Sequence, residues 1–178
     1  MTAVMRILLV ALALATLVGC TGGGPRAGAR VISPFGALTS AEGSQRVYGP
    51  HIGIDVAAAV GTPVLAAADG LVWSIGDDGP CGTVIVVTHE SFGTEGFATR
   101  YCHLSVVRAA YQQRVRRGEV IALTGTTGQK LGTGFERLHF ELRRGWDAID
   151  PMPFIVGCFD QGHTYATNRL VLTYPVAC

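Results

Sequence analysis

Thr83-Val84-Ile85-Val86-Val87-Thr88 is a run of six β-branched residues near the middle of the chain. Such side chains favour an extended backbone, because they pack well against their neighbours on a pleated surface. The segment from Phe97 to Leu104 would return antiparallel to this run, and the loop between the two carries Gly93 and Gly96. The pattern therefore predicts a β-hairpin.

Further short strands are predicted on both sides of this hairpin. Leu138-His139-Phe140-Glu141-Leu142 alternates apolar and polar residues, whereas Val106 to Gln113 is the one short segment with the pattern of a helix. Glycine is abundant at 24 residues and charged residues make up 15%, which is typical of turn-rich β proteins. We expect a mainly β fold, a compact antiparallel β-sheet domain with little helix. Other predicted strands are 30–36, 51–56, 64–68, 70–75 and 115–123, and 40–49 is predicted to be a loop.

The charge of the chain gives no reason to expect a nucleic-acid partner. The formal net charge is +1, and no short stretch forms a strong basic block. Arg114, Arg116 and Arg117 form a small cluster near a turn, which predicts a solvated face. The length of 178 residues leaves one ordinary domain after an export segment.

The N-terminus has the pattern of a bacterial export signal. Arg6 precedes an apolar run to Val18 that is short for a membrane-spanning helix, which needs about 20 apolar residues. The run ends in Leu17-Val18-Gly19-Cys20, which resembles the lipobox whose cysteine is lipidated; an ordinary cleaved signal is the alternative. We interpret residues 1–20 as a lipoprotein signal peptide and 21–29 as a flexible tether. This predicts a membrane-anchored lipoprotein of the cell envelope, facing the periplasm or the cell exterior.

Four cysteines remain if Cys20 is lipidated, and an even number in an oxidising compartment suggests two disulfides. Three pairings are possible. We favour Cys81 with Cys102, because they flank the predicted hairpin, and Cys158 with Cys178, which would pin the C-terminal tail. None has the close C-x-x-C spacing of a structural zinc site.

Histidines recur on three of the predicted strands. His51 and Asp55 stand four apart, and even spacing on a regular strand puts both side chains on one face. His139 lies opposite the apolar face of its strand, and His103 shares a face with Tyr101. Surface pairs of histidine and aspartate are far commoner than metal sites, so His51 and Asp55 alone are weak evidence. Three such elements in one small domain favour a cluster.

These motifs resemble the lysostaphin-type (LytM-like) zinc metallopeptidases, which are peptidoglycan endopeptidases. The resemblance covers about Val31 to Pro153 and implies a mostly antiparallel β domain with a groove crossed by the metal. It places zinc ligands at His51, Asp55 and His139, with a fourth position left for water. It also gives His103 a catalytic role outside the ligand set. The matching motifs, in family order, are His51–Asp55, Gly61–Gly70, Tyr101–Leu104, Arg117–Ala122 and Leu138–Glu141.

One position departs from the family pattern. The family ends its site with His-x-His, whereas this chain has Arg137-Leu138-His139. Arginine is always protonated and cannot act as a general base. Arg137 should share a face with His139 and point toward the metal, where its charge needs a carboxylate or a substrate anion beside it.

Three interpretations of Arg137 follow, of which we favour an active enzyme. In the first, Arg137 stabilises the oxyanion or holds a substrate carboxylate, and catalysis continues. In the second, the domain binds zinc and peptidoglycan but cleaves little, and acts as a binding or hydrolase-activating module. In the third, another residue supplies the base. His163 has no place in the motifs, Glu136 should face away, and His89 is expected to be structural or to face the substrate.

The motifs also set the predicted domain boundaries. We expect the peptidase domain at residues 30–155 and a C-terminal extension at 156–178, tied by the second disulfide. Zn²⁺ is the expected cofactor and peptidoglycan the expected substrate. The sequence leaves open which peptide bond would be cleaved.

Overall fold

The computed structural model describes residues 29–40, 47–92, 95–128 and 136–178. The predicted signal peptide, Cys20 and the tether up to residue 28 lie outside these residues. In the part of the chain that is described, we find no helix with the length and apolar character needed to cross a membrane.

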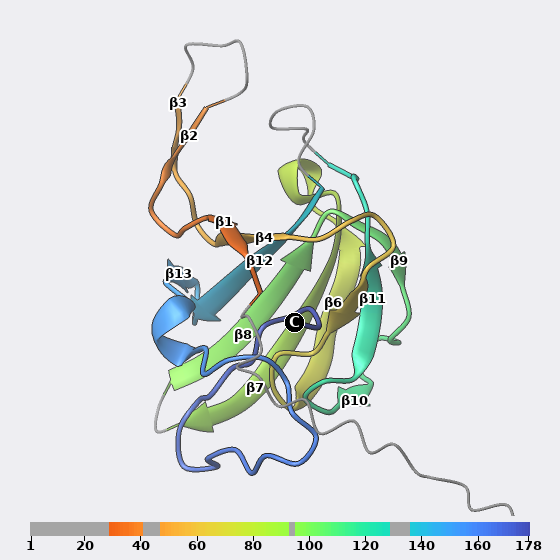
Figure 1. Cartoon of the computed structure of the whole chain (residues 1–178), viewed down its shortest axis with the longest axis vertical. Helices are drawn as coiled ribbons and strands as arrows, with labels where there is room; N and C mark the ends of the chain where they lie inside the picture. Colours follow the sequence, from red (N-terminus) through yellow and green to blue (C-terminus); the bar gives the residue numbers. More distant parts are fainter. Residues whose placement is uncertain (1–28, 41–46, 93–94, 129–135) are drawn as a thin grey trace, which may run out of the picture.

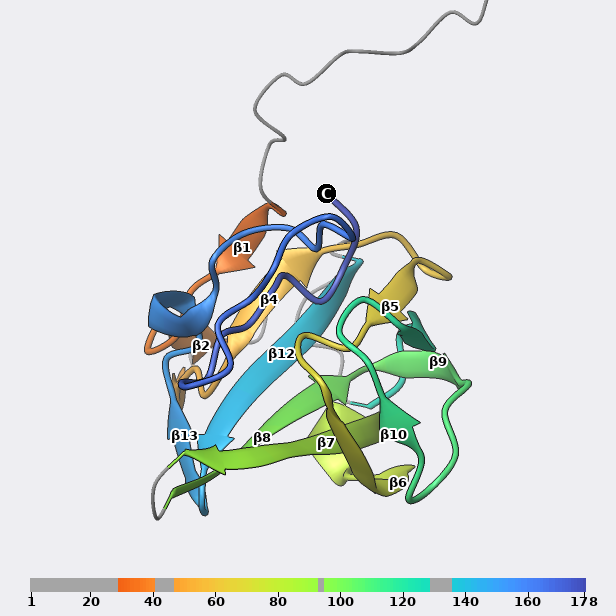
Figure 2. The same ribbon diagram turned by 90° about the horizontal axis from the view of Figure 1, so that it is seen from below.

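An eight-stranded sheet forms the body of the molecule, as Figures 1 and 2 show. The predicted hairpin is β7–β8, in which Ile85 lies opposite Tyr101. All pairs of named strands are antiparallel, so the predicted mainly β, antiparallel fold is confirmed. The strand order is β1 (Val31–Ser33), β4 (Ile54–Ala57), β12 (Arg137–Arg144), β8 (Glu95–Cys102), β7 (Thr83–Phe92), β6 (Gly70–Asp77) and β10 (Arg114–Val115), with β13 (Asp147–Ile149) beside β12.

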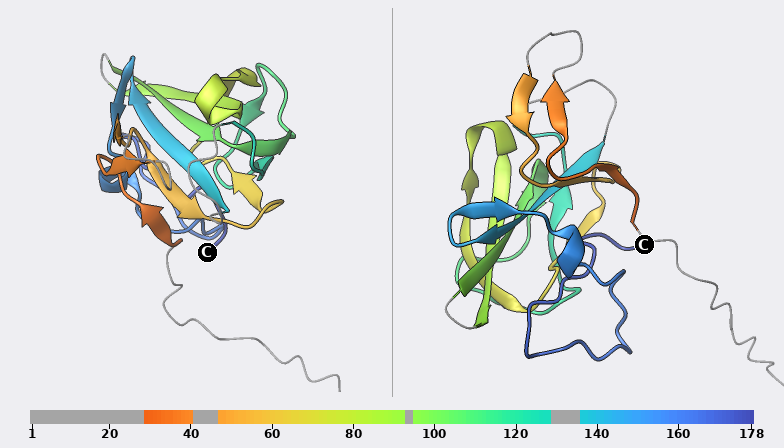
Figure 3. Two further views of the ribbon diagram at one scale, coloured as in Figure 1. Left: turned by 90° about the horizontal axis from the view of Figure 1, so that it is seen from above. Right: turned by 90° about the vertical axis from the view of Figure 1, so that its left-hand side faces the viewer.

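The remaining strands form two smaller sheets. One has the order β5 (Pro63–Leu65), β11 (Val120–Thr124) and β9 (Leu104–Val107). The other is the hairpin of β2 (Leu38–Ser40) and β3 (Val47–Pro50), which projects from the main sheet (Figure 3). Two single turns of 3₁₀ helix, η1 (Gly79–Cys81) and η2 (Met152–Phe154), are the helical elements of the described residues.

The helix predicted at Val106 to Gln113 is wrong. Val106 and Val107 belong to β9 and pair with Leu123 and Ala122 of β11. β-Branched side chains fit this edge of the sheet better than they fit a helix. The loop predicted at 40–49 is also wrong at its ends, where β2 and β3 pair; residues 41–46 lie outside the described part.

The core lies against the sheet and includes the C-terminal segment. Leu138, Phe140 and Leu142 of β12 are fully buried on the face that the alternation predicts. Each such side chain contributes about 1.5–3 kcal/mol through burial. Leu170 and Leu172 join the same core. Residues 170–176 of the C-terminal segment are therefore packed into the domain.

The prediction of a solvated basic face is wrong for Arg117. Its Nη1 donates to the carbonyl of Ala67 at 2.6 Å and its Nη2 to that of Val171 at 2.8 Å. Its guanidinium also lies over the ring of Tyr165, 4.2 Å from the centroid. Arg117 thus joins the C-terminal segment to the loop before β6, while Arg114 and Arg116 are exposed.

The structure contains two disulfides with the pairing that the sequence favours. Cys81 is bonded to Cys102, and Cys158 to Cys178. The first lies at the end of β8 beside His103. The second ties the final residue of the chain to the segment that follows η2.

Candidate metal centre

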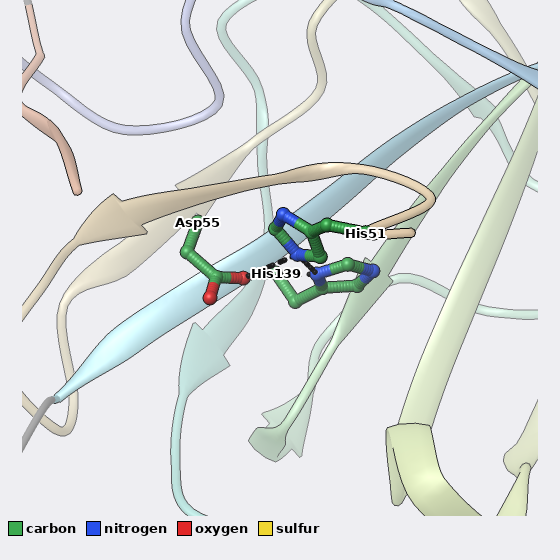
Figure 4. A group of neighbouring side chains, drawn as sticks. All are labelled: His51, Asp55 and His139. Carbon is green, nitrogen blue, oxygen red and sulfur yellow. Dashed lines mark hydrogen bonds and ion pairs between the residues drawn. The ribbon is translucent and has the colours of Figure 1, made fainter. Parts of the chain in front are cut away.

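His51, Asp55 and His139 lie together where β4 meets β12. Asp55 of β4 stands directly opposite His139 of β12. His51 precedes β4, and the chain bends at Ile52 and Gly53 before the strand begins. The expectation that a regular strand carries both His51 and Asp55 is therefore wrong for His51. The bend, rather than period two, turns its ring toward the other two side chains, as Figure 4 shows.

The ligand atoms of the three residues form a small triangle. His51 Nε2 lies 3.0 Å from His139 Nδ1 and 3.3 Å from Asp55 Oδ1. His139 Nδ1 lies 2.9 Å from the same oxygen. The described residues thus hold two imidazoles and one carboxylate aimed at one point.

The outer nitrogens of both rings have acceptor partners. His51 Nδ1 donates to the carbonyl of Pro34 at 2.9 Å, and His139 Nε2 donates to Glu141 Oε1 at 3.2 Å. In each neutral ring the nitrogen that faces the centre is then a lone-pair acceptor. Three acceptor atoms therefore converge with no donor among them. This arrangement is stable only if a cation or an added proton lies between them.

This donor set fits zinc. Zinc binds histidine nitrogen and carboxylate oxygen at about 2.0–2.2 Å in tetrahedral sites, which places the ligand atoms roughly 3.3 Å apart. The separations of 2.9–3.3 Å observed here are close to that spacing. Catalytic zinc sites use three protein ligands and keep a fourth position open, and three candidate ligands converge here.

Glu141 accepts a hydrogen bond from the outer nitrogen of His139 and so orients its ring. The sequence pattern did not assign this role. Its side chain is 1% exposed, and its charge is compensated by Arg100 Nη1 at 3.1 Å and Arg143 Nε at 2.7 Å. Metal-binding histidines commonly donate their other nitrogen to a carboxylate in this way, which fixes the tautomer. The alternation of β12 could have indicated this role, because a period of two places Glu141 on the same face as His139.

Neighbouring groups set the charges of the centre. Burial disfavours charge on Asp55, yet the rings of His139 and His51, each of which donates a hydrogen bond to this carboxylate once it gains a proton, outweigh burial and hold the pKa of Asp55 far below its ordinary value. Burial also disfavours the protonated form of His139, but hydrogen bonds with Asp55 and Glu141 raise the pKa of His139. A proton at His139 therefore competes with a metal ion for this centre.

His103 lies beside the triangle and is outside the ligand set. Its ring centroid is 6.1 Å from that of His139. Its Nδ1 donates to the carbonyl of Thr127 at 2.8 Å, so Nε2 is the acceptor in the neutral ring. Burial lowers the pKa of His103, although its hydrogen bond to Thr127 opposes the shift. Burial therefore favours the neutral form of His103.

Arg137 lies on the same side as His139, as the sequence predicts, but its charge is taken up by Asp55. Arg137 Nε is 3.1 Å from Asp55 Oδ2 in an ion pair, while Oδ1 of the same carboxylate faces the two imidazoles. The carboxylate that an arginine needs next to a metal is therefore Asp55 itself.

The other candidates for a catalytic base lie elsewhere. His163 contacts the ring of Tyr165 in the C-terminal segment, with centroids 4.7 Å apart. Glu136 Oε2 accepts the backbone N–H of Val60 at 3.3 Å. His89 is 8% exposed and bonds to the carbonyl of Asp69 and to Thr99. The interpretation in which one of these residues supplies the base loses its support.

Known proteins share the sequence and fold of this chain. The profile of Peptidase family M23 matches residues 49–151. The DD-carboxypeptidase/endopeptidase Mpg of Neisseria meningitidis serogroup B is 37% identical over 123 residues, 69% of this chain and 26% of that protein. The murein hydrolase activator NlpD of Escherichia coli K12 is 32% identical over 127 residues, 71% of this chain and 29% of that protein.

A solved structure agrees with these matches. The crystal structure of a zinc containing peptidase from Vibrio cholerae superposes with a TM-score of 0.60 at 34% identity, over 71% of this chain and 37% of that one. This chain thus spans a minor part of the length of each of the three proteins. The family profile covers more than half of the 178 residues, and we conclude that the chain belongs to peptidase family M23.

Proposed function

We propose that this protein is a zinc metalloendopeptidase that hydrolyses peptide cross-links of bacterial peptidoglycan. The observation that carries the proposal is the convergence of His51 Nε2, Asp55 Oδ1 and His139 Nδ1 on one point, with no donor among them. A catalytic zinc site of family M23 would need this donor set, and His103 stands beside it with one ring nitrogen to spare.

Each of these side chains has a part in the proposed reaction. Zinc in such a set supplies Lewis acidity, which polarises a peptide carbonyl and makes water more acidic. His103 would accept the proton of the attacking water at Nε2 and pass it to the leaving amine. The hydrogen bond from its Nδ1 to Thr127 keeps the ring in the tautomer that this transfer needs.

Arg137 would act through its fixed charge. It lies beside Asp55, so it can stabilise the oxyanion that forms on the scissile carbonyl or hold a substrate carboxylate. The same ion pair draws charge from a zinc ligand, which makes Asp55 a weaker donor. Arg137 would therefore modify the site without supplying a base.

A second function is supported by that same residue. Arg137 replaces a histidine of the family pattern, and loss of a well-placed base commonly costs about 10²–10⁴-fold in rate. One relative, NlpD, is named a murein hydrolase activator. The alternative is a zinc-containing module that binds peptidoglycan or activates another hydrolase.

Digestion of peptidoglycan separates the two functions. We would incubate the purified protein with zinc and peptidoglycan and measure new peptide termini, with Asp55→Ala as the metal-site control. Release by wild type that Asp55→Ala abolishes supports the peptidase. No release by wild type, with cleavage gained by Arg137→His, would establish the binding module instead.

The same proposal places the protein in the cell envelope, where its substrate lies. Anchoring through a lipid on Cys20 is part of it and rests on the sequence pattern alone. Replacing Cys20 with alanine would then move the protein out of the membrane fraction, and an unchanged distribution would remove the anchor from the proposal.

A further inference from the structure

The Cys81–Cys102 disulfide lies next to the candidate metal centre and has no part in the proposed chemistry. Cys102 is the last residue of β8, is fully buried, and stands directly opposite His139 in the sheet. Cys81 ends η1, in the loop that joins β6 to β7. The bond therefore fastens this loop to the residue that precedes His103.

The backbone of His103 has an unusual conformation, which its surroundings must impose. Its φ is +61°, a left-handed conformation that costs a residue other than glycine about 1 kcal/mol or more and persists only where the surroundings impose it. The backbone N–H of His103 donates to the carbonyl of Cys81 at 2.8 Å. One partner of the disulfide thus also fixes the amide of His103.

The carbonyl that orients the ring of His103 rests on the same loop. Thr127 accepts from His103 Nδ1, and its Oγ accepts the backbone N–H of Thr83 at 3.0 Å. Gly82 packs so tightly against Thr127 and Gly128 that a Cβ on it would lie 2.3 Å from Gly128 N and 2.4 Å from the carbonyl carbon of Thr127. The backbone and the ring of His103 therefore both depend on where residues 81–83 lie.

Besides the strands at its two ends, the disulfide and the side chain of Arg100 fasten this loop to β8 in the described part of the chain. Arg100 forms an ion pair with Asp78 and donates a long hydrogen bond of 3.8 Å to Cys81 Sγ. Asp78 is well exposed, so solvent weakens the ion pair. The covalent bond is the strongest of these contacts.

We propose that the Cys81–Cys102 disulfide is a positioning element that holds His103 in its left-handed conformation beside the metal centre. Cys81 and Cys102 do not touch the reacting groups; they act through the amide of His103 and through Thr127. Because such a bond forms only in an oxidising compartment, the site would be completed there. The consequence for catalysis rests on the proposed function, whereas the conformation of His103 does not.

The second disulfide provides a matched control. Cys158–Cys178 spans 20 residues and Cys81–Cys102 spans 21, so the two double variants lose about equal loop-closure entropy in the unfolded chain. We would compare Cys81→Ser/Cys102→Ser with Cys158→Ser/Cys178→Ser. Serine also avoids free thiols that could bind added zinc.

The main readout is hydrogen exchange of the His103 amide, which needs no activity. We expect exchange at least about tenfold faster in Cys81→Ser/Cys102→Ser than in wild type or the control, because the bond to Cys81 opens locally. Zinc content should be equal in both variants, since the three ligands stay in place. Where wild type cleaves peptidoglycan, kcat should fall about tenfold or more with little change in KM.

Equal exchange of the His103 amide in the two variants would overturn the proposal. If Cys81→Ser/Cys102→Ser does not fold, the Cys158→Ser/Cys178→Ser protein is measured before and after a dithiol reductant, since its single remaining disulfide is the one in question. Reduction breaks the S–S bond and leaves two thiols, with two electrons and two protons from the reductant. A wild type that cleaves nothing would count against the proposed function alone, because the exchange result stands without activity.

Discussion

Gly53 allows the bend after His51 to lie against the ring of His139. A Cβ built on it would be 2.5 Å from the carbonyl oxygen of Phe140 and 2.8 Å from His139 Cε1. Cβ atoms do not approach other heavy atoms so closely, so any side chain here must displace the bend, the backbone of β12 or the imidazole. His139, a ligand of the proposed zinc site, therefore keeps its position because residue 53 has no side chain.

Gly53→Ala should therefore weaken zinc binding while the fold remains. We expect a loss of roughly tenfold or more in affinity, the range seen when the support of a metal ligand is disturbed. Titration against a competing chelator measures it. The control is Gly76→Ala on β6, where a Cβ meets nothing within 4 Å. Equal affinities of the two variants would contradict the role given to Gly53.

The three proposed ligands could be predicted from the sequence, but the side chains around them could not. His51, Asp55 and His139 stand in motifs that can be read directly from the chain. The partners of Arg137 and Glu141 could not be read in the same way. Those of Arg137 depend on the register of β4 against β12, which places Asp55 between His139 and Arg137. Those of Glu141 depend on the register of β8 against β12, which places Arg100 opposite Glu141.

At the scale of elements, the turn after β10 joins parts of the chain that are far apart in sequence. Arg117 donates to the carbonyls of Ala67 and Val171, and its backbone N–H donates to Asp69 Oδ1 at 2.7 Å. Its neighbour Arg116 is exposed. The spacing of the arginines in the sequence did not distinguish the half-buried Arg117 from the exposed ones, because only the path of the C-terminal segment does so.

Arg117→Met should destabilise the protein by about 1.5–3 kcal/mol, because it removes charged donors from two carbonyls in the interior. Chemical denaturation at constant pH measures the change. Arg116→Met is the control and should alter the free energy of unfolding by less than about 0.5 kcal/mol. If both variants were equally stable, Arg117 would not fasten the C-terminal segment.

The strands of β7, β8 and β12 could be predicted because their patterns are long and regular. β9 was mistaken for a helix because Val106 to Gln113 is short, and pairing with β11 decided its conformation. Short elements at the edge of a sheet take their structure from their partners, which one sequence does not show.

The stability of the whole molecule includes a buried polar network. His89 bonds to the carbonyl of Asp69 at 2.8 Å and to Thr99 Oγ at 2.9 Å. Thr99 Oγ lies 3.0 Å from the hydroxyl of Tyr101, which accepts the N–H of Ala67. Burial lowers the pKa of His89 from 6.5 to about 4 and raises the pKa of Tyr101 to about 12.

Stability should therefore fall as the pH drops below 6.5. In that range the unfolded chain binds a proton at His89 that the folded protein excludes until about pH 4. The loss amounts to about 1.4 kcal/mol per pH unit and up to about 3 kcal/mol in all. His89→Gln should show a shallower decline between pH 6.5 and 5 in denaturant titrations. The exposed His163→Gln should keep the decline of wild type, and an unchanged slope in His89→Gln would refute the assignment.

The fold class of the whole molecule could be predicted from the chain, while the extent of its core could not. The sequence predicts residues 156–178 only as an extension tied by a disulfide, because they lie beyond the family motifs. Yet Leu170, Leu172 and Val176 are buried with the strands of the sheet. Apolar residues in an irregular segment have no period that would show this.

Zinc content tests whether His51, Asp55 and His139 form a metal centre. Purified protein would be loaded with zinc at neutral pH, dialysed and analysed for metal by mass spectrometry, alongside His139→Ala and the control His163→Ala. The proposed site predicts one tightly held zinc ion per chain in wild type and His163→Ala, and none in His139→Ala. Wild type without zinc, or His139→Ala with a full complement, would contradict a metal centre formed by His51, Asp55 and His139.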